Sequence, residues 1–397
     1  MKITHMKSFI QLSFVCLLSL VSLHTMAHED HTKHQKTTLA VSVAFDAKGQ
    51  LWRATTTDGF VWVDSSSDLG KTFNQPIKLN AESQKIGADG EARPKIAISD
   101  KGDIYVTWTQ MLKQPFTGYI WFARSQNQGK TFDKPMIVHQ DRAEITHRFD
   151  ALHIAPDGVI TVLWIDKRDL VAAKTANKAY AGAAIYYAQS TDKGATFKPE
   201  QKLADSSCEC CRIATATSMN GGVVALWRHV YATNERDHAI AEISKGKASE
   251  PKRASFGRWV IDGCPHQGGA LALGAGFGYH MAYFDGQDKK PGLYVSRMDG
   301  EAWVTSPAKK FGDNSKSASH PDLLSIGENV WLVWRETQGT QHQIFGMSSD
   351  DGGRSWNEAK LLTKADGKVD YPFLMANQKQ VYLSWNTANG LQIMPLN

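Results

Sequence analysis

An apolar hairpin recurs along the chain, and this repeat constrains the fold more than any other feature. Each copy is an apolar strand, a turn containing Gly or Asn, and a second strand that often ends in Trp. Successive copies begin about 50 to 65 residues apart, which is typical of a repeat architecture. The copies are 41–55, 93–108, 148–164, 212–227, 268–283, 321–334 and 371–385. A third strand follows most of them, so the repeat predicts an all-β chain of small antiparallel sheets.

A second signature follows the third strand of several copies. It reads Ser-x-Asp-x-Gly-x-Thr-aromatic. Good copies lie at 66–73 and 190–197, variants at 125–132 and 349–356, and one degenerate copy at 296–303. The spacing predicts a self-closed turn. The Asp side chain accepts backbone N–H bonds, the Gly takes a positive φ, and the aromatic ring covers the hairpin.

These segments resemble the Asp-box, or BNR, repeat of the sialidase superfamily, and the resemblance covers nearly all of the chain beyond residue 38. It implies a single β-propeller of four-stranded antiparallel blades over 39–397. It also implies that Asp68, Asp192 and Asp351 are structural turn residues on the face away from the ligand. Seven hairpins favour seven blades, and six blades plus an accessory hairpin is the alternative. Residues 36–40 are a candidate fourth strand for the short last blade, where they would remove an exposed edge.

The N-terminal segment 1–27 reads as a signal peptide. Lys2 and Lys7 form a basic region, 9–23 is apolar, and a small-x-Ala pattern ends at Ala27. We expect cleavage after Ala27 and a periplasmic or secreted protein. No later segment is long and apolar enough to be a transmembrane span.

A polar, His-rich tail follows over 28–38. Its histidines, His28, His31 and His34, suit a metal such as copper or zinc, and a solvated tail is the alternative. The formal net charge is only +5 and no long basic run occurs, so nucleic acid is not an expected partner. We expect a monomer whose ligand is either a metal ion or a small acidic glycan.

One end of the predicted propeller gathers Arg, His, Cys and acidic residues. We call this end the rim: it comprises the loops that enter each first strand and the loops that leave each second strand. The opposite turns are ordinary, such as AKG, DKG, PDG and NGG. Convergent polar groups at a channel mouth predict a functional site. The entering loops carry Glu91, Arg93, His147, Arg148, Asp150, Cys208, Cys210, Cys211, Arg212, Cys264, His266, His320, Asp322, Asp370 and Tyr371. The leaving loops carry Gln110, Asp166, Arg168, Asp169, Arg228, His229, Asp285, Arg335, Glu336 and Asn386.

The cysteines support a first functional hypothesis, a soft-metal or redox site. Four cysteines remain after the predicted cleavage, and disulfides are the default in an oxidising compartment. Full pairing would need a bond within 208–211, and bonds between such near neighbours in sequence strain disulfide geometry. A single bond from Cys264 to the cluster would leave two thiols free. The alternative is a copper or zinc site. Its ligands would be Cys208, Cys210, Cys211, Cys264, His266 and His229, with His147 and His320 as neighbours.

The resemblance implies a second hypothesis, an exo-sialidase-type glycoside hydrolase that acts on acidic glycans. Sialidases clamp the substrate carboxylate with three arginines, protonate with an Asp and attack with a Tyr that a Glu activates. The matching positions are Arg93, Arg148, Arg212, Arg228 and Arg335 for the clamp, Asp150 for the acid and Tyr371 for the nucleophile. The family's aromatic-Arg-Ile-Pro motif is reduced to Ala92-Arg93-Pro94. A third hypothesis is a scaffold propeller without chemistry.

Overall fold

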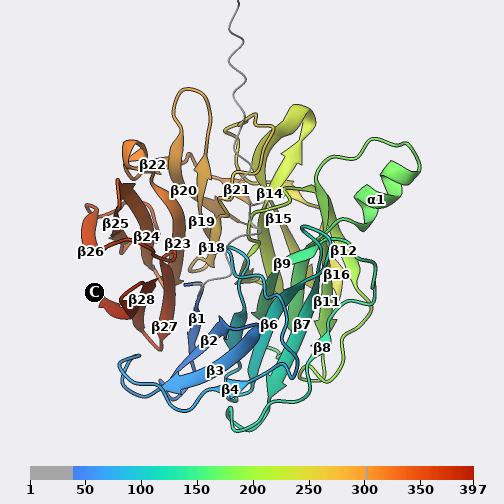
Figure 1. Cartoon of the computed structure of the whole chain (residues 1–397). Helices are drawn as coiled ribbons and strands as arrows, with labels where there is room; N and C mark the ends of the chain where they lie inside the picture. Colours follow the sequence, from blue (N-terminus) through green and yellow to red (C-terminus); the bar gives the residue numbers. More distant parts are fainter. Residues whose placement is uncertain (1–38, 301–302) are drawn as a thin grey trace, which may run out of the picture. The chain divides into compact units, whose positions relative to one another are not determined.

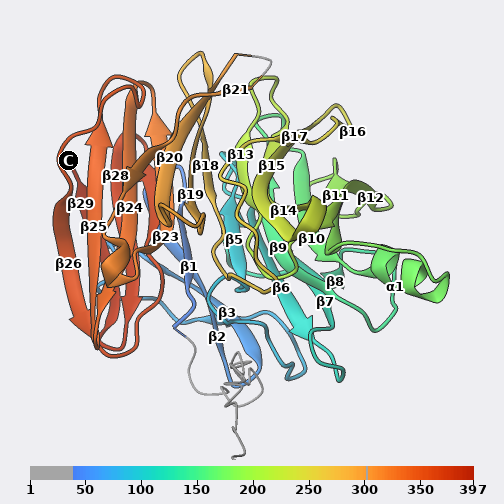
Figure 2. The same ribbon diagram turned by 90° about the horizontal axis from the view of Figure 1, so that it is seen from above.

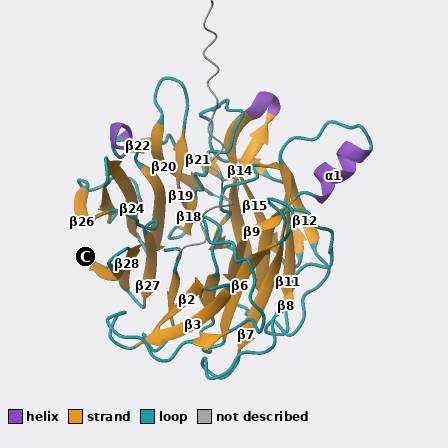
Figure 3. Ribbon diagram, in the orientation of Figure 1, coloured by secondary structure: helices purple, strands orange, loops and turns teal. Residues whose placement is uncertain are grey.

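The computed structural model describes residues 39–300 and 303–397, and these residues are mostly strands joined by tight turns (Figure 3). The predicted signal peptide 1–27 and the tail 28–38 lie outside the described residues. The helices among the described residues are α1 (Arg168–Thr175) and two single 3-10 turns, Ala232–Asn234 and Asn314–Lys316. None of them has the length and apolarity needed to cross a membrane.

The strands form successive antiparallel sets, and the first three sets have four strands each. Set one is β1 (Ser42–Phe45), β2 (Leu51–Thr57), β3 (Phe60–Ser66) and β4 (Ile77–Lys78). Set two is β5 (Lys95–Ile98), β6 (Ile104–Met111), β7 (Gly118–Ser125) and β8 (Met136–Ile137). Set three is β9 (His147–Ile154), β10 (Ile160–Asp166), β11 (Ala183–Ser190) and β12 (Gln201–Ser207).

The remaining sets follow the same order, with variations at the outer strands. Set four is β13 (Ala214–Thr217), β14 (Val223–Tyr231) and β15 (Glu235–Ser244), with β16 (Lys247–Ala248) and β17 (Lys252–Arg253) on β15. Set five is β18 (Ala270–Leu273), β19 (Gly278–Asp285) and β20 (Gly292–Asp299), with β21 (Val304–Thr305) and β22 (Lys309–Phe311) on β20. Set six is β23 (Ser319–Ile326), β24 (Asn329–Gln338), β25 (Gln341–Ser349) and β26 (Lys360–Asp366). Set seven is β27 (Phe373–Asn377), β28 (Gln380–Thr387) and β29 (Gly390–Leu396).

The sets succeed one another in chain order around a common centre, from blue to red in Figure 1. The first strand of each set lies beside the first strand of the next set, and β27 lies beside β1. A single residue pair, Ser207 with His229, also joins β12 to β14. Figure 2, turned by 90°, shows α1 projecting beyond the sheets. This order places the loops before all first strands at one end.

Tryptophans on the second strands fill the space between neighbouring sheets. Five of them are essentially fully buried: Trp108, Trp164, Trp227, Trp334 and Trp385. Each indole N–H has an acceptor, as a buried Trp requires; the indole of Trp164 donates to Asp166 at 2.9 Å and that of Trp334 to Glu336 at 2.9 Å. The recurrence of Trp at the end of the hairpin therefore reflects the wedge-shaped gap that each pair of sheets must fill.

The Ser-x-Asp turns have the hydrogen bonds that the sequence predicts. The Asp68 carboxylate accepts bonds from the Thr72 backbone N–H at 2.9 Å and its hydroxyl at 2.7 Å, and from the Ser66 hydroxyl at 2.7 Å. These bonds, led by that from the Thr72 hydroxyl, lower the pKa of Asp68 well below its usual range. The same bonds recur at Asp192 and Asp351. Since strands alternate in direction, these turns lie at the end opposite the rim.

The first and last sets of strands meet, but not through the fourth strand that residues 36–40 were expected to add to the last sheet. The described part of 36–40, Leu39 and Ala40, forms no strand, so it does not extend the three-stranded last sheet. Instead, the Asn386 amide donates to the Leu39 carbonyl at 2.9 Å, and the Val41 N–H donates to the Asp370 carboxylate at 3.3 Å. The contact is made at the rim end of the first strands.

The buried tryptophans give a stability prediction. Replacing Trp334 by Ala should lower the free energy of unfolding by about 3–5 kcal/mol, because it leaves a cavity in a tightly packed core. Urea unfolding followed by circular dichroism measures this change. The control is Val304→Ala, since Val304 is 64% exposed and should change stability by no more than about 0.5 kcal/mol. Equal losses in the two variants would contradict this account of the core.

Candidate functional site

Glu91 joins its own rim loop to three others. Its carboxylate accepts the backbone N–H of Arg212 at 2.8 Å and that of Gly268 at 2.8 Å. The imidazole of His320 lies 4.0 Å from the same carboxylate. Glu91 is buried, so these bonds compensate for the desolvation of its charge. The loops that enter β5, β13, β18 and β23 therefore converge, as the rim hypothesis predicts.

Arg93 is committed to a structural ion pair. Its guanidinium makes a bidentate pair with Asp370 at 2.6 and 2.7 Å. It also donates to the carbonyls of Gly90 at 2.6 Å and Val41 at 3.0 Å. Both partners of the pair are buried, and such a pair persists only where its donors and acceptors are satisfied. Arg93 therefore links sets one, two and seven and uses four of its five N–H donors within the protein.

Arg212 is also used within the protein. It donates to the carbonyls of Gly269 at 2.9 Å and Pro321 at 2.6 Å, and lies 3.8 Å from the Asp322 carboxylate. Arg228, deeply buried on β14, likewise donates to backbone carbonyls. These two side chains brace neighbouring loops rather than present open guanidinium groups.

Arg148 retains part of its hydrogen-bonding capacity. Its guanidinium pairs with Asp89 at 3.3 Å and lies 4.9 Å from the centroid of the Phe149 ring. Its Nε is buried without an acceptor among the described residues. Four of the five predicted clamp arginines, namely Arg93, Arg148, Arg212 and Arg228, thus have different roles. Together they do not present the three open guanidinium groups that a carboxylate clamp needs.

Arg335, Tyr371 and His320 form a stack at the rim. The Tyr371 and His320 rings are nearly parallel, with centroids 3.5 Å apart. The Arg335 guanidinium carbon lies 4.8 Å from the Tyr371 centroid. The described residues offer Arg335 one long hydrogen bond, 3.5 Å to the Ser319 hydroxyl, and leave its buried Nε without an acceptor. Arg335 is thus a half-buried cation with donors to spare.

Burial controls the protonation of this stack. It holds the pKa of His320 well below its usual value, and the charges of Arg335 and Arg212 lower it further. His320 is therefore neutral at pH 7, with Nε2 close to the His266 carbonyl at 3.1 Å. Burial also raises the pKa of Tyr371, which keeps the phenol protonated. The stack can therefore place the protonated Tyr371 phenol beside an anionic group bound by Arg335.

Lys95 is a rim residue that the sequence reasoning missed. Its ammonium donates to the carbonyls of Glu91 at 3.3 Å and Arg93 at 3.2 Å. Burial lowers the pKa of Lys95 to about 8, despite the opposing charge of Asp150. Asp150, the predicted acid, accepts the hydroxyls of Thr107 at 2.6 Å and Thr109 at 3.1 Å. Side chains alternate between the two faces of a strand, and Lys95 follows Arg93 by two residues. This spacing is the sequence signal that places Lys95 on the same face as Arg93.

The predicted cysteine site is partly assembled. The Cys208 sulfur lies 3.8 Å from that of Cys210 and 3.9 Å from that of Cys211, and all three are buried. Cys264 is exposed, and its thiol interacts with Cys210. His229 lies apart from this cluster. It accepts the Trp227 indole N–H at 3.3 Å and packs on Tyr231, with ring centroids 4.4 Å apart.

His266 contacts the rim through its backbone carbonyl. Its carbonyl accepts from His320, and its φ of 49° places it in the left-handed region. The group of possible metal ligands that the described residues bring within 4.8 Å of one another consists of the three cysteines of 208–211. The structure thus brings three of the six predicted ligands into one cluster, with Cys264 beside it.

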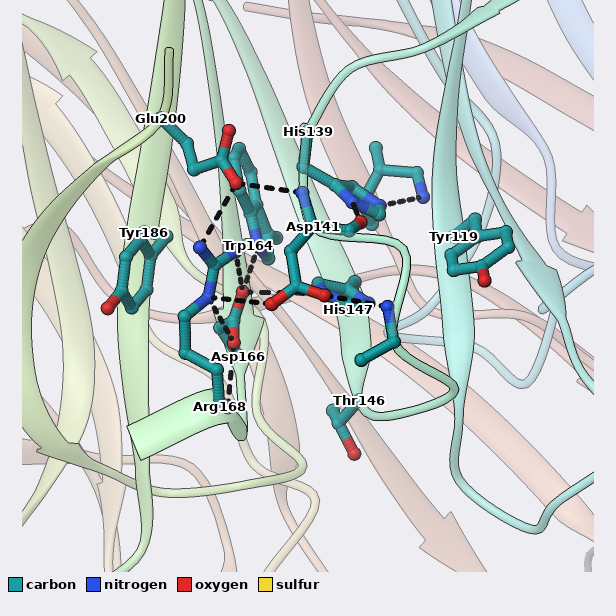
Figure 4. Close-up of polar contacts among 12 residues, drawn as sticks. Tyr119, His139, Asp141, Thr146, His147, Trp164, Asp166, Arg168, Tyr186 and Glu200 are labelled. Carbon is teal, nitrogen blue, oxygen red and sulfur yellow. Dashed lines mark hydrogen bonds and ion pairs between the residues drawn. The ribbon is translucent and has the colours of Figure 1, made fainter. Parts of the chain in front are cut away.

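His147 belongs to a separate buried network at the rim end of set three (Figure 4). Its ring stacks on His139 with centroids 4.0 Å apart. Its Nδ1 donates to the Gly118 carbonyl at 2.9 Å, and its Nε2 lies 3.6 Å from Asp166 and 3.9 Å from Asp141. His147 is therefore a packed core histidine and contacts no cysteine in this cluster.

Arg168 completes this network from the first turn of α1. Its guanidinium donates to Asp166 at 2.7 Å and to Glu200 at 3.0 Å, and it lies 4.1 Å from the centroid of the Tyr186 ring. Two backbone N–H groups also donate to Glu200, from Gln140 at 2.8 Å and Asp141 at 3.1 Å. The Arg168 and Glu200 side chains are hydrogen-bonded within this group, which fits a structural role, whereas His147 Nε2 is buried without a hydrogen-bond partner among the described residues.

The succession of antiparallel sheets around a common centre defines a β-propeller fold. The structure is similar to an ulvan lyase of polysaccharide lyase family PL25, at 13% identity and a TM-score of 0.56, over 89% of this chain and 93% of that chain. It is also similar to the Hadza microbial sialidase Hz136, at 13% identity and a TM-score of 0.50, over 86% of this chain and 74% of that chain. At this identity the likeness concerns the fold. No protein-family model and no curated protein sequence matches the chain.

The His139 network gives a pH prediction. Burial lowers the pKa of His139 to about 3 in the folded protein, below the value of 6.5 expected when the chain is unfolded. The unfolded state therefore takes up a proton first, and the stability present above pH 6.5 should fall by up to about 1.4 kcal/mol per pH unit between pH 6.5 and 3. Urea unfolding of the wild type and His139→Gln at several pH values measures this slope. In the variant, the free energy of unfolding should depend less steeply on pH, by the contribution of one titrating group. Equal slopes in the two proteins would refute the lowered pKa of His139.

Proposed function

We propose that this protein acts on acidic glycans, with the substrate at the rim beside Arg335, Tyr371 and Lys95. The observation that carries this proposal is the open guanidinium of Arg335 on the ring of Tyr371. A planar guanidinium with free donors suits the bidentate recognition of a carboxylate. The half-buried position of both residues leaves them accessible while strengthening the interaction with an anion.

Several features support a cleaving function over simple binding. The rim combines a protonated phenol, a neutral imidazole and a lysine whose pKa of about 8 lies close to neutral pH. Among these three groups, Lys95 is the one whose pKa is displaced toward neutral pH, as general acid–base catalysis requires. The similar structures are named as a sialidase and an ulvan lyase, and the lyase was bound to a glucuronic acid and sulfated rhamnose unit. Both names point toward acidic glycans.

In this proposal Arg335 binds the substrate carboxylate and Lys95 adds a second positive charge. Tyr371 is the group closest to the bound anion, and it serves as nucleophile or proton donor. Glu91 and Arg93 flank Tyr371 and contribute to its electrostatic environment. The Glu91 carboxylate is occupied by two backbone N–H groups, so it acts on Tyr371 through its charge.

We also infer that the seven strand sets are the seven blades of one propeller. The count is supported by the neighbouring first strands, in which each set takes one place and β27 lies beside β1. The hydrogen bond from Asn386 to Leu39 supports closure between the last and first sets. A six-bladed propeller would leave one set as an accessory hairpin outside this succession.

Arg335→Lys tests the carboxylate-binding role. The variant keeps the charge but loses the planar fork, so kcat/KM on the best substrate should fall about 10- to 100-fold, which corresponds to about 1.4–2.8 kcal/mol. Sialosides and uronic acid polysaccharides form the substrate panel, assayed by new reducing ends. Arg354→Lys, at the opposite end, is the matched control and should leave the rate unchanged. The same rate in both variants would remove Arg335 from the site.

Tyr371→Phe separates binding from chemistry. Removing the phenol oxygen keeps the ring that stacks on His320, so we expect Kd for the oligosaccharide to change by less than about threefold. Turnover should be lost, because the group that attacks or transfers the proton is gone. Ultraviolet absorbance of an unsaturated uronic acid identifies a lyase product, and a reducing end without it identifies hydrolysis. Binding without turnover in the wild type would leave a non-catalytic glycan-binding propeller.

A further inference from the structure

The loop between β12 and β13 gathers three sulfur atoms in a buried cluster. Cys208, Cys210 and Cys211 each have 2–5% of their surface exposed. Backbone hydrogen bonds fix the start of this loop, because the Cys208 N–H donates to the Arg228 carbonyl at 2.8 Å. Glu91 fixes its end through the Arg212 N–H at 2.8 Å. The thiols are thus held together by anchors on both sides.

The sulfur separations match the coordination sphere of a thiolate-binding ion. With metal–sulfur bonds of about 2.3 Å, neighbouring sulfurs lie about 3.8 Å apart in tetrahedral and about 4.0 Å apart in trigonal geometry. The distances from the Cys208 sulfur are 3.8 Å to Cys210 and 3.9 Å to Cys211, and all three sulfurs lie within 4.8 Å of one another. The two separations from the Cys208 sulfur therefore match those expected around one thiolate-bound metal ion.

The surroundings suit negatively charged sulfur. The positive charges of Arg228 and Arg236 interact electrostatically with Cys208. Arg148 also interacts electrostatically with Cys210. The Nε atoms of Arg228 and Arg148 are buried without acceptors among the described residues. Cationic groups around a buried cluster stabilise the charge of a metal–thiolate unit.

We propose that Cys208, Cys210 and Cys211 bind one Cu(I) ion as a three-coordinate thiolate site. Soft thiolates select Cu(I), and three ligands with no imidazole in the cluster suit its low coordination number. A structural zinc site needs a fourth protein ligand, for which Cys264 is the neighbouring thiol. The binding step is not a redox reaction: Cu(I) enters as Cu(I), and the thiols that bind it release their protons to water.

The site goes beyond the proposed glycan function and is separate from it. Arg335 and Tyr371 contribute nothing to the sulfur cluster, so copper binding is measured independently of glycan turnover. Glu91 nevertheless contacts the loop of the cluster, because its carboxylate accepts the N–H of Arg212, which follows Cys211. Metal loading supplies no ligand to the substrate.

The experiment is an anaerobic Cu(I) titration of the reduced full-length protein in competition with a chromogenic Cu(I) chelator. The wild type should withdraw one equivalent of Cu(I) from the chelator and develop a thiolate-to-copper charge-transfer band. Cys211→Ser should weaken Cu(I) binding at least about 100-fold, since loss of one ligand of three removes several kcal/mol. Cys264→Ser is the matched control, and it should retain both the band and the affinity.

Other outcomes overturn the proposal. A wild type that cannot compete with the chelator has no Cu(I) site of this kind. Preferential Zn²⁺ binding that Cys264→Ser abolishes would replace it with a four-thiolate zinc site. Thiol titration of denatured, unreduced protein that finds the cluster cysteines in disulfides would assign them a structural role. Circular dichroism of each variant, together with the charge-transfer band of the wild type, keeps the test decisive if a Ser variant fails to fold.

Discussion

The buried ion pair between Arg93 and Asp370 is the contact on which the geometry of the rim depends. It joins the loop before β5 to the loop before β27, two segments that are 277 residues apart in the chain. The same pair receives the Val41 N–H on Asp370 and donates to the Val41 carbonyl from Arg93. One bidentate contact therefore fixes the first, second and last strand sets relative to one another. Removing either partner would leave the other charge buried, which costs several kcal/mol.

The rim uses its arginines in two different ways. Arg93, Arg212 and Arg228 direct their donors to carboxylates and carbonyls within the protein, and so they brace the loops. Arg335 lies over Tyr371 with donors that the described residues do not fill. A propeller opens many loops at one end, and most polar groups there are needed to hold those loops. The side chains left unpaired are consequently the best candidates for contact with a substrate.

The cysteine cluster and the stack of Arg335, Tyr371 and His320 are connected through Glu91. Its carboxylate anchors the N–H of Arg212, directly after Cys211, and lies 4.0 Å from His320, which stacks on Tyr371. A change in the cluster, such as metal loading, would thus reach the stack through short, rigid contacts. This arrangement makes the separate readouts of copper binding and glycan turnover informative about each other.

Much of the fold was predictable, because hairpins, Trp positions and Ser-x-Asp turns are local features. A turn such as that at Asp68 closes on its own residues, and alternation along a strand already separates core from rim. The gathering of polar residues at one end was predictable for the same reason. Lys95 was missed although alternation from Arg93 places it on the same face. The roles of single rim residues were less accessible, since each depends on partners in other sets.

The sequence by itself determined the all-β repeat, the self-closed turns and the clustering of three cysteines within one loop. Only the tertiary structure decided that Arg93 pairs with Asp370, that His229 and His147 lie apart from the thiols, and that Arg335 remains open over Tyr371. The physical reason is range. Turn and strand chemistry acts within a few residues, whereas pairing, burial and pKa depend on groups that the closed arrangement of sheets brings together from distant parts of the chain.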